Sequence, residues 1–129
     1  MEMEKNTPAI TSANRANKYC LFPIQYQNLW QLGKKAAASF WVVEEICAMT
    51  KDRDDVAKMS EAEQNFIFTV LGFFSASDLL VNENLVCRFM QDVDIPEAQY
   101  FYAIQIAIEA IHSETYATLI DTLFLDKKK

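Results

Sequence analysis

Residues 104–116 read IQIAIEAIHSETY and contain the only histidine of the chain, His112. Glu109 stands three positions before it. Residues three positions apart on a helix lie on one face, about 60° apart around the axis. The side chains of Glu109 and His112 can therefore bind the same metal ion. A Glu-x-x-His pair that faces the inside of a bundle is typical of helical proteins that bind two iron or manganese ions. The isoleucines around the pair strengthen this interpretation, because a carboxylate buried without a partner is costly.

The apolar periodicity around this stretch predicts a helix from Pro96 to about residue 125, and two more long helices over about 26–49 and 60–90. Pro96 is tolerated because it falls in a first turn, where its missing N–H is no loss. The charged stretch 50–58 is expected to be a connecting loop, and residues 91–95 a break before the third helix. These elements predict an all-α fold, and helices of this length occur in bundles.

The second helix has a clear start signal. Ser60 and Glu63 form a capping box, in which the serine hydroxyl accepts the backbone N–H of Glu63 and the glutamate reaches back to the N–H of Ser60. Behind this start, the second and third helices both carry apolar residues around much of their circumference. A three-helix pack does not need so much apolar surface, which indicates that neighbouring elements are missing.

Composition supports a helical protein and argues against several functions. The 129 residues are 51% hydrophobic and include two glycines and three prolines, fewer turn residues than a sheet protein of this size usually needs. A net charge of −6 argues against a nucleic-acid partner, because phosphate binding requires a basic face. The three cysteines are widely spaced and odd in number, which does not suit a disulfide framework.

The chain is expected to be cytoplasmic and to have no membrane partner. Residues 1–18 are polar and aperiodic, lack the apolar core of a signal peptide, and are expected to be disordered. Residues 66–74, the most apolar stretch, are about half the length that a membrane span requires. A single domain is expected over residues 19–129.

A second unusual carboxylate lies in the middle of the predicted second helix. Asp78 follows the run Phe73-Phe74-Ser75-Ala76-Ser77, in a position where a lone aspartate has poor helix propensity. It is either a polar residue on the outer face or a third metal ligand that faces Glu109 and His112 from the antiparallel neighbour. Glu83 is the nearest rival carboxylate and is expected to face solvent or a partner.

Two aromatic residues stand near these candidates. Tyr116 falls four positions after His112, on the same stripe of the helix. Trp41 lies late in the first predicted helix, before Glu44 and Glu45. From the residues alone, core packing explains both rings and a solvated face explains the two glutamates.

These motifs occur in the order and spacing of the small, radical-bearing subunit of class I ribonucleotide reductase, and they are most similar to its eukaryotic and viral branch. The resemblance covers about residues 20–126. The segments that carry it are Phe22-Pro23-Ile24 with Tyr26 and Trp30; Ala38-Ser39-Phe40-Trp41 with Glu44-Glu45; Phe73 to Asp78; Val81-Asn82-Glu83-Asn84-Leu85; and Gln105-Ile106-Ala107, Glu109, Ile111-His112-Ser113-Glu114, Tyr116 and Leu119-Ile120-Asp121-Thr122.

The resemblance implies a ferritin-like helical bundle, of which this chain carries the first half. Asp78, Glu109 and His112 match ligands of the first iron ion, and the ligand types also suit manganese. Tyr116 matches the tyrosine that is oxidised to a stable radical, and Trp41 matches the tryptophan that carries an electron to the site. The implied enzyme is an oxidoreductase that makes deoxyribonucleotides, and its partner, the large subunit, performs the reduction itself.

Three departures from the family pattern stand out. Cys47 replaces an aspartate that usually follows the paired glutamates, and Leu79 replaces a glycine after Asp78, which is expected to tighten packing beside the metal. The family's second half supplies a further glutamate, a second Glu-x-x-His and the tail that docks on the large subunit. The chain ends at Lys129 with one histidine, so one copy is expected to hold only half of the di-iron site.

Three interpretations stay open at this point. The chain is a fragment of the small subunit that is inactive alone. Or it is a half-site protein that works as a homodimer, with two copies of the three ligands around one centre, or with a second polypeptide that supplies the missing half. Or it is a non-catalytic modulator that binds the full-length small subunit. Iron content measured against oligomeric mass separates these interpretations.

Overall fold

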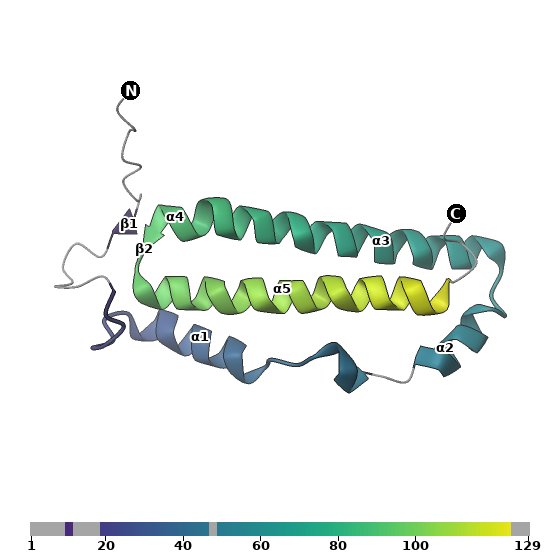
Figure 1. Ribbon diagram of the computed structural model, residues 1–129, viewed down its shortest axis with the longest axis horizontal. Helices are drawn as coiled ribbons and strands as arrows, with labels where there is room; N and C mark the ends of the chain where they lie inside the picture. Colours follow the sequence, from purple (N-terminus) through teal and green to yellow (C-terminus); the bar gives the residue numbers. More distant parts are fainter. Residues whose placement is uncertain (1–9, 12–18, 47–48, 125–129) are drawn as a thin grey trace, which may run out of the picture. The chain divides into compact units, whose positions relative to one another are not determined.

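Most of the described chain is helical, and the fold is all-α as predicted (Figure 1). The computed structural model describes residues 10–11, 19–46 and 49–124. These form two compact units, residues 1–40 with 83–107 and residues 41–82 with 108–129. Two long helices, α3 (Glu61–Asn84) and α5 (Pro96–Leu123), each contribute residues to both units.

The unit of residues 41–82 and 108–129 places the start of α3 and the end of α5 side by side and antiparallel (Figure 1). The rings of Phe68 and Phe124 lie 5.4 Å apart, edge to face. The hydroxyl of buried Ser113 donates to the backbone oxygen of Ser75 at 3.3 Å. None of the residues of α3 is fully buried, so these few contacts set the distance and register between the two helices.

The capping box at the start of α3 forms as predicted. The backbone N–H of Ser60 donates to Oε2 of Glu63 at 2.8 Å, and the N–H of Glu63 donates to the Ser60 hydroxyl oxygen at 3.3 Å. The Ser60 hydroxyl also donates to the same carboxylate oxygen at 2.7 Å. The hydroxyl bond, and then the backbone bond, hold the pKa of Glu63 below its usual value, because both favour the charged form.

The unit of residues 1–40 and 83–107 packs α1 (Gln27–Ala38) against the first turns of α5. Gly33 is buried there, and a Cβ built on it would lie 2.7 Å from Cδ1 of the Tyr100 ring. The rings of Trp30 and Tyr100 lie 5.0 Å apart. The glycine that weakens α1 as an isolated helix therefore leaves the room in which the Tyr100 ring lies.

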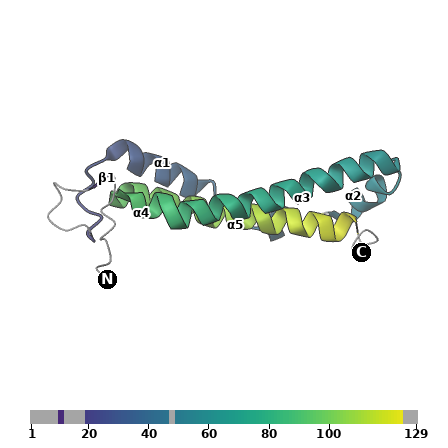
Figure 2. The same ribbon diagram turned by 90° about the horizontal axis from the view of Figure 1, so that it is seen from above.

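In the same unit, a short connection joins the end of α3 to α5. Its elements are the π-helix η2 (Leu85–Phe89), α4 (Met90–Asp92) and the strand β2 (Val93–Asp94), which pairs in parallel with β1 (Ile10–Thr11). In the view from above, α4 lies over the first turns of α5 (Figure 2). Nε2 of Gln99 donates to the backbone oxygen of Val93 at 3.0 Å. Buried Glu97 accepts the backbone N–H of Gln25 at 2.8 Å, which ties the segment before α1 to α5.

Two predicted boundaries are wrong. The first helix ends at Ala38 instead of near residue 49, and the stretch 50–58 is mostly helical, as α2 (Met49–Val56), rather than a loop. The Ser39 hydroxyl donates back to the oxygen of Lys35 at 3.0 Å, and the aromatic and β-branched residues that follow are poor helix formers. The charges of 50–58 suggested a loop, but a short exposed helix tolerates them. Of the segment 1–18, expected to be disordered, only β1 is described.

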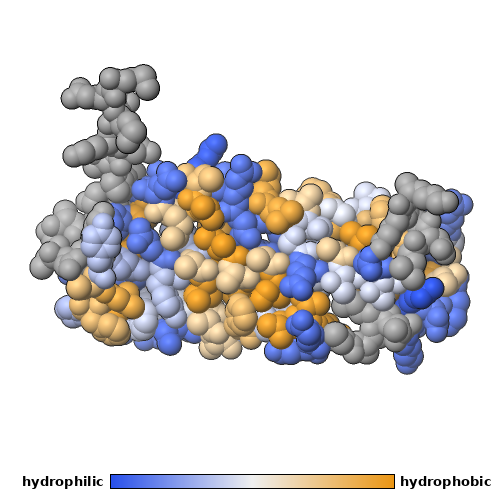
Figure 3. Space-filling model, viewed as in Figure 1, coloured by the Kyte–Doolittle hydropathy of each residue, from blue (hydrophilic) through white to orange (hydrophobic). Residues whose placement is uncertain are grey.

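Apolar surface is exposed on the long helices. Phe66 is 71% exposed and Phe73 is 66% exposed. In the space-filling view, orange apolar surface interrupts the blue over α3 and along α5 (Figure 3). The helical run of residues 61–92 is long and apolar enough, by length and composition, to cross a membrane. One such helix is weak evidence for a span, since core helices of water-soluble proteins pass the same test, and the absence of a membrane partner stays a prediction.

Candidate metal centre

Three side chains that can bind a metal converge in the unit of residues 41–82 and 108–129. Asp78 comes from α3, and Glu109 and His112 come from α5. Each offers one ligand atom, and these atoms all lie within 4.8 Å of one another. The antiparallel packing of α3 on α5 therefore places Asp78 opposite the Glu-x-x-His pair, and all three side chains are half-buried.

Glu109 and His112 lie three positions apart on α5, and this spacing brings their side chains together. Nδ1 of His112 and Oε2 of Glu109 lie 3.1 Å apart. The side chain of Glu109 is 18% exposed and that of His112 is 35% exposed, so the carboxylate is the more deeply placed of the two. In the tautomer that carries its proton on Nδ1, His112 donates to Glu109 and keeps the lone pair of Nε2 for another partner.

Asp78 carries an electrostatic cost at its position in the cluster. Its Oδ2 is buried, and none of the described residues donates a hydrogen bond to it. Burial raises the pKa of Asp78 above its usual value, the charge of Glu109 raises it further, and His112 lowers it. An ionised Asp78 therefore lacks the compensation that a buried carboxylate needs.

The donor set fits iron or manganese. Two carboxylates and one imidazole suit Fe²⁺ and Mn²⁺, and within the described part of the chain no cysteine sulfur joins the group. A cation between Asp78 and Glu109 would supply the orphaned Oδ2 with a partner and remove the repulsion between the two carboxylates. Bundles that hold two such ions repeat the ligand set on a second helix pair, whereas the described residues contain one such group.

Trp41 lies against the imidazole of this cluster. Its ring centroid is 5.8 Å from that of His112, and the two ring planes are tilted by 35°. Trp41 stands in the non-helical segment before η1 (Val43–Ile46), not late in a helix as predicted. The structure thus brings the predicted tryptophan and histidine together, although through a different local conformation.

Tyr116 lies about one turn beyond His112 on α5 and stacks on Phe74 of α3. The two ring centroids are 5.5 Å apart and the planes are 25° from parallel. Phe74 had no predicted role of its own. Its position four residues before Asp78, on the same side of α3, is the signal that could have identified it.

Several other residues singled out in the sequence take no part in the cluster. Glu83, Glu44 and Glu45 are exposed. Leu79 is 58% exposed, so the prediction that it tightens packing beside the metal is wrong. The physical reason is that successive residues of a helix point about 100° apart, and Asp78 already points toward α5. Cys47 lies outside the described residues.

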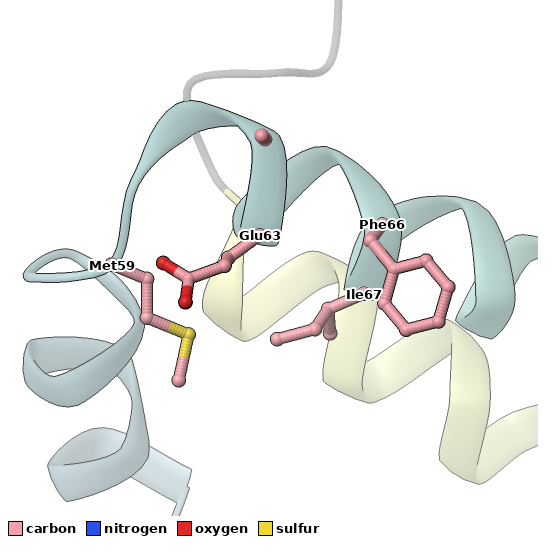
Figure 4. Close-up of a pocket in the computed structure, with 5 residues that line it drawn as sticks. Met59, Glu63, Phe66 and Ile67 are labelled. Atoms are coloured by element: carbon pink, nitrogen blue, oxygen red, sulfur yellow. The ribbon is translucent and has the colours of Figure 1, made fainter.

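A separate open hollow of about 510 Å³ lies at the start of α3 and offers no catalytic group. In Figure 4, the side chains of Met59 and Ile67 point toward one another below Glu63. Its lining residues are Met59, Ala62, Glu63, Phe66 and Ile67. The one charged group among them, Glu63, is already bonded to Ser60.

Comparisons with known proteins show the family to which this chain is similar. A family model described as ribonucleotide reductase, small chain, matches residues 18–129. The chain is 55% identical over 113 residues to the ribonucleoside-diphosphate reductase small chain of Yaba-like disease virus, covering 88% of this chain and 34% of the relative. It is 50% identical over 129 residues to the ribonucleoside-diphosphate reductase small subunit of Dictyostelium discoideum, covering 98% of this chain and 38% of the relative. The chain spans about a third of the length of these relatives.

The fold has a similar solved structure, that of the ribonucleotide reductase Rnr4 homodimer from Saccharomyces cerevisiae. The TM-score is 0.77 at 36% sequence identity, and the match covers 87% of this chain and 35% of the yeast chain. The predicted ferritin-like helical fold is confirmed, as is the resemblance to viral and eukaryotic small subunits that the motifs indicated. The chain belongs to the ribonucleotide reductase small-chain family.

Proposed function

We propose that this chain provides one half of the di-iron centre of a ribonucleoside-diphosphate reductase small subunit, whose tyrosyl radical serves deoxyribonucleotide synthesis. The observation that carries the proposal is the convergence of Asp78, Glu109 and His112 within 4.8 Å. A buried Asp78 oxygen without a donor among the described residues supports it, because a cation is the partner that such an oxygen lacks. Membership of the small-chain family supplies the class of reaction.

Each residue of the cluster has a role in this proposal. Asp78, Glu109 and His112 hold a metal ion through carboxylate oxygens and an imidazole nitrogen. Bound iron, once oxidised by dioxygen, would supply the oxidising equivalent for a tyrosine. Tyr116 would give up its hydroxyl proton and one electron to that oxidant, and Phe74 covers one face of its ring. Trp41, which lies against His112, conducts an electron toward the site.

The proposal requires partners. A further glutamate and a second Glu-x-x-His are needed for a two-metal centre of this kind, and the described residues hold one such group. We propose that the complementary ligands come from further small-chain sequence or from a separate polypeptide, and that the large subunit performs the reduction. The single chain is then inactive alone, and the assembly works in the cytoplasm.

Metal binding by the 129-residue chain tests the proposal. Protein purified without oxygen is dialysed against ferrous iron, and its iron content is measured at equilibrium. We expect wild-type protein to bind iron and His112→Ala to lower its affinity by more than about tenfold, because a direct ligand matters at least as much as the groups that orient ligands. Tyr116→Phe should keep the iron.

Glu114→Ala is the matched control, because this exposed glutamate lies on α5 two positions after His112. It should bind iron as the wild type does. Equal iron in wild-type and His112→Ala protein would show that the histidine is not a ligand and would overturn the assignment.

A further inference from the structure

Ser113 differs from three other hydroxyl residues of the long helices in the partner that it bonds. Those three donate to the backbone oxygen four positions before them in their own helix, at 2.8, 2.8 and 2.7 Å; they are Thr69, Ser77 and Thr115. Serine and threonine commonly form such bonds inside helices. The hydroxyl of Ser113 instead donates to the backbone oxygen of Ser75 on α3, at 3.3 Å. Ser113 therefore joins two helices, whereas its neighbour Thr115 joins two turns of one helix.

The acceptor of this bond is a backbone atom, so the bond depends on the position of α3 itself. A side-chain acceptor can turn to follow its donor, whereas a carbonyl oxygen inside a helix moves only with the helix. No residue of α3 is fully buried, and apolar contact is non-directional, so it does little to fix where α3 lies along α5. Ser113 is 9% exposed, and a hydroxyl as buried as this one is normally hydrogen-bonded. The bond from Ser113 to Ser75 therefore fixes the position of α3 along α5.

The bond lies about one helical turn from the candidate metal ligands. Ser75 is three positions before Asp78 on α3, and Ser113 is four positions after Glu109 on α5. Residues at these spacings lie on one face of a helix. All four residues belong to the unit of residues 41–82 and 108–129, in which α3 and α5 are antiparallel (Figure 1). The bonded serines and the two carboxylates are therefore neighbours along the same contact between the helices.

The metal cluster depends on the register of the two helices. The ligand atoms of Asp78, Glu109 and His112 lie within 4.8 Å of one another. A slide of α3 by the rise of one residue would move Asp78 by about 1.5 Å, more than the roughly 0.5 Å within which a binding site must be held. Burial raises the pKa of Asp78, and repulsion by the charge of Glu109 raises it further. Asp78 therefore needs a restraint that opposes this repulsion.

We propose that Ser113 is a positioning residue of the metal site, and that its bond to Ser75 holds Asp78 in place. The bond keeps Asp78 opposite Glu109 and His112, and Ser113 itself binds no ion. This role rests on the proposed metal function and adds to it a residue that is not a ligand.

Iron affinity tests the role of Ser113. Protein purified without oxygen is dialysed against ferrous iron at a series of concentrations. Ser113→Ala should weaken iron binding about tenfold, as the loss of groups that orient ligands does. Thr115→Val is the matched control and should bind iron as the wild type does, because it removes a hydroxyl that is 8% exposed and bonds only its own helix. Equal affinity of wild-type and Ser113→Ala protein, or equal weakening by both variants, would contradict the positioning role.

Stability without metal is a second test, and it does not depend on iron. With a chelator present, Asp78→Asn should raise the midpoint of urea unfolding, because it removes one of two charges that repel each other. In Ser113→Ala protein, α3 can shift and relieve the repulsion, so Asp78→Asn should raise the midpoint less. In Thr115→Val protein the full increase should remain. The same increase in all three backgrounds would show that Ser113 does not hold Asp78 and would overturn the proposal.

The two measurements separate the role of Ser113 from the proposed metal function. If the wild type binds no iron but Ser113→Ala reduces the effect of Asp78→Asn, the metal function fails and the hold of Ser113 on Asp78 is supported. If the wild type binds iron and Ser113→Ala changes neither the affinity nor the effect of Asp78→Asn, the positioning role alone fails.

Discussion

At the scale of single residues, Asp78 determines how the cluster responds to pH. Its pKa is raised by burial and then by the charge of Glu109. A carboxyl group whose pKa is higher in the folded than in the unfolded state binds protons more readily when folded. The ionised form of Asp78 therefore opposes folding at neutral pH. As the pH falls toward the raised pKa, protonation of this carboxyl group raises the free energy of unfolding.

Replacing Asp78 by asparagine tests this cost. We expect Asp78→Asn to raise the free energy of unfolding of the metal-free protein at neutral pH by up to about 1 kcal/mol, since solvent screens a half-buried group. The variant should also lack the gain in stability that the wild type shows as pH falls. Urea titrations at a series of pH values with a chelator present measure both effects.

Asp55→Asn is the control for this experiment, because Asp55 is exposed and pairs with Lys58 at 2.8 Å. It should not raise the free energy of unfolding at neutral pH, because an exposed carboxylate carries no burial cost that its loss would relieve. If Asp78→Asn lowers the stability at every pH, the carboxylate is stabilised by the fold and the electrostatic argument for a cation fails.

Two contacts of single residues depend on how α3 and α5 pack together. The position of Asp78 in an apolar helix made it unusual, but an outer-face role explained it equally well until α5 was placed beside it. The stack of Phe74 on Tyr116 depends on the same packing, because the two residues are on different helices. Contacts of this kind depend on helix rotation, which a local pattern does not specify.

At the scale of elements, the approach of α1 to α5 depends on Gly33. We expect Gly33→Ala to lower the free energy of unfolding by about 1–3 kcal/mol, because the added methyl would lie 2.7 Å from the Tyr100 ring and the packing must shift. The better helix propensity of alanine offsets part of this loss, by about 1 kcal/mol. Thermal and urea unfolding measure the difference.

A double-mutant cycle separates the clash from other effects. In a Tyr100→Ala background the ring is absent, so Gly33→Ala should cost nothing or be stabilising. The same loss in both backgrounds would contradict the packing of α1 on α5 through this ring.

Local signals predicted some elements well and others poorly. The capping box of Ser60 and Glu63 and the first-turn Pro96 located the starts of α3 and α5, because caps act through bonds within one turn. The end of α1 was missed because apolar periodicity continues past Ala38, where the backbone stops being helical. The charged residues of α2 carried no apolar stripe, so nothing in their pattern distinguished a helix from a loop.

At the scale of the whole molecule, the proposed half-site predicts complementation. The chain is mixed with the part of the Dictyostelium discoideum small subunit that lies beyond the matched region, and metal ions are counted by native mass spectrometry after anaerobic iron loading. We expect two ions per complex and fewer on the chain alone, because two ligand sets bind the pair of ions together.

The His112→Ala chain is the control for complementation. It should still form the complex but hold fewer ions, since helix packing does not depend on the imidazole. A complex that binds two ions equally well with His112→Ala would place the whole centre in the added segment and leave this chain without a metal role.

The sequence by itself determined the all-α class, the starts of the two long helices and the one-sided spacing of Glu109 and His112. These depend on hydrogen bonds within a turn and on the fixed pitch of a helix, both of which are local. Only the tertiary structure decided that Asp78 faces that pair, that Trp41 lies against His112 and that Leu79 points away. The reason is that the rotation and register of α3 on α5 come from contacts between residues far apart in the chain, such as that of Ser113 with Ser75.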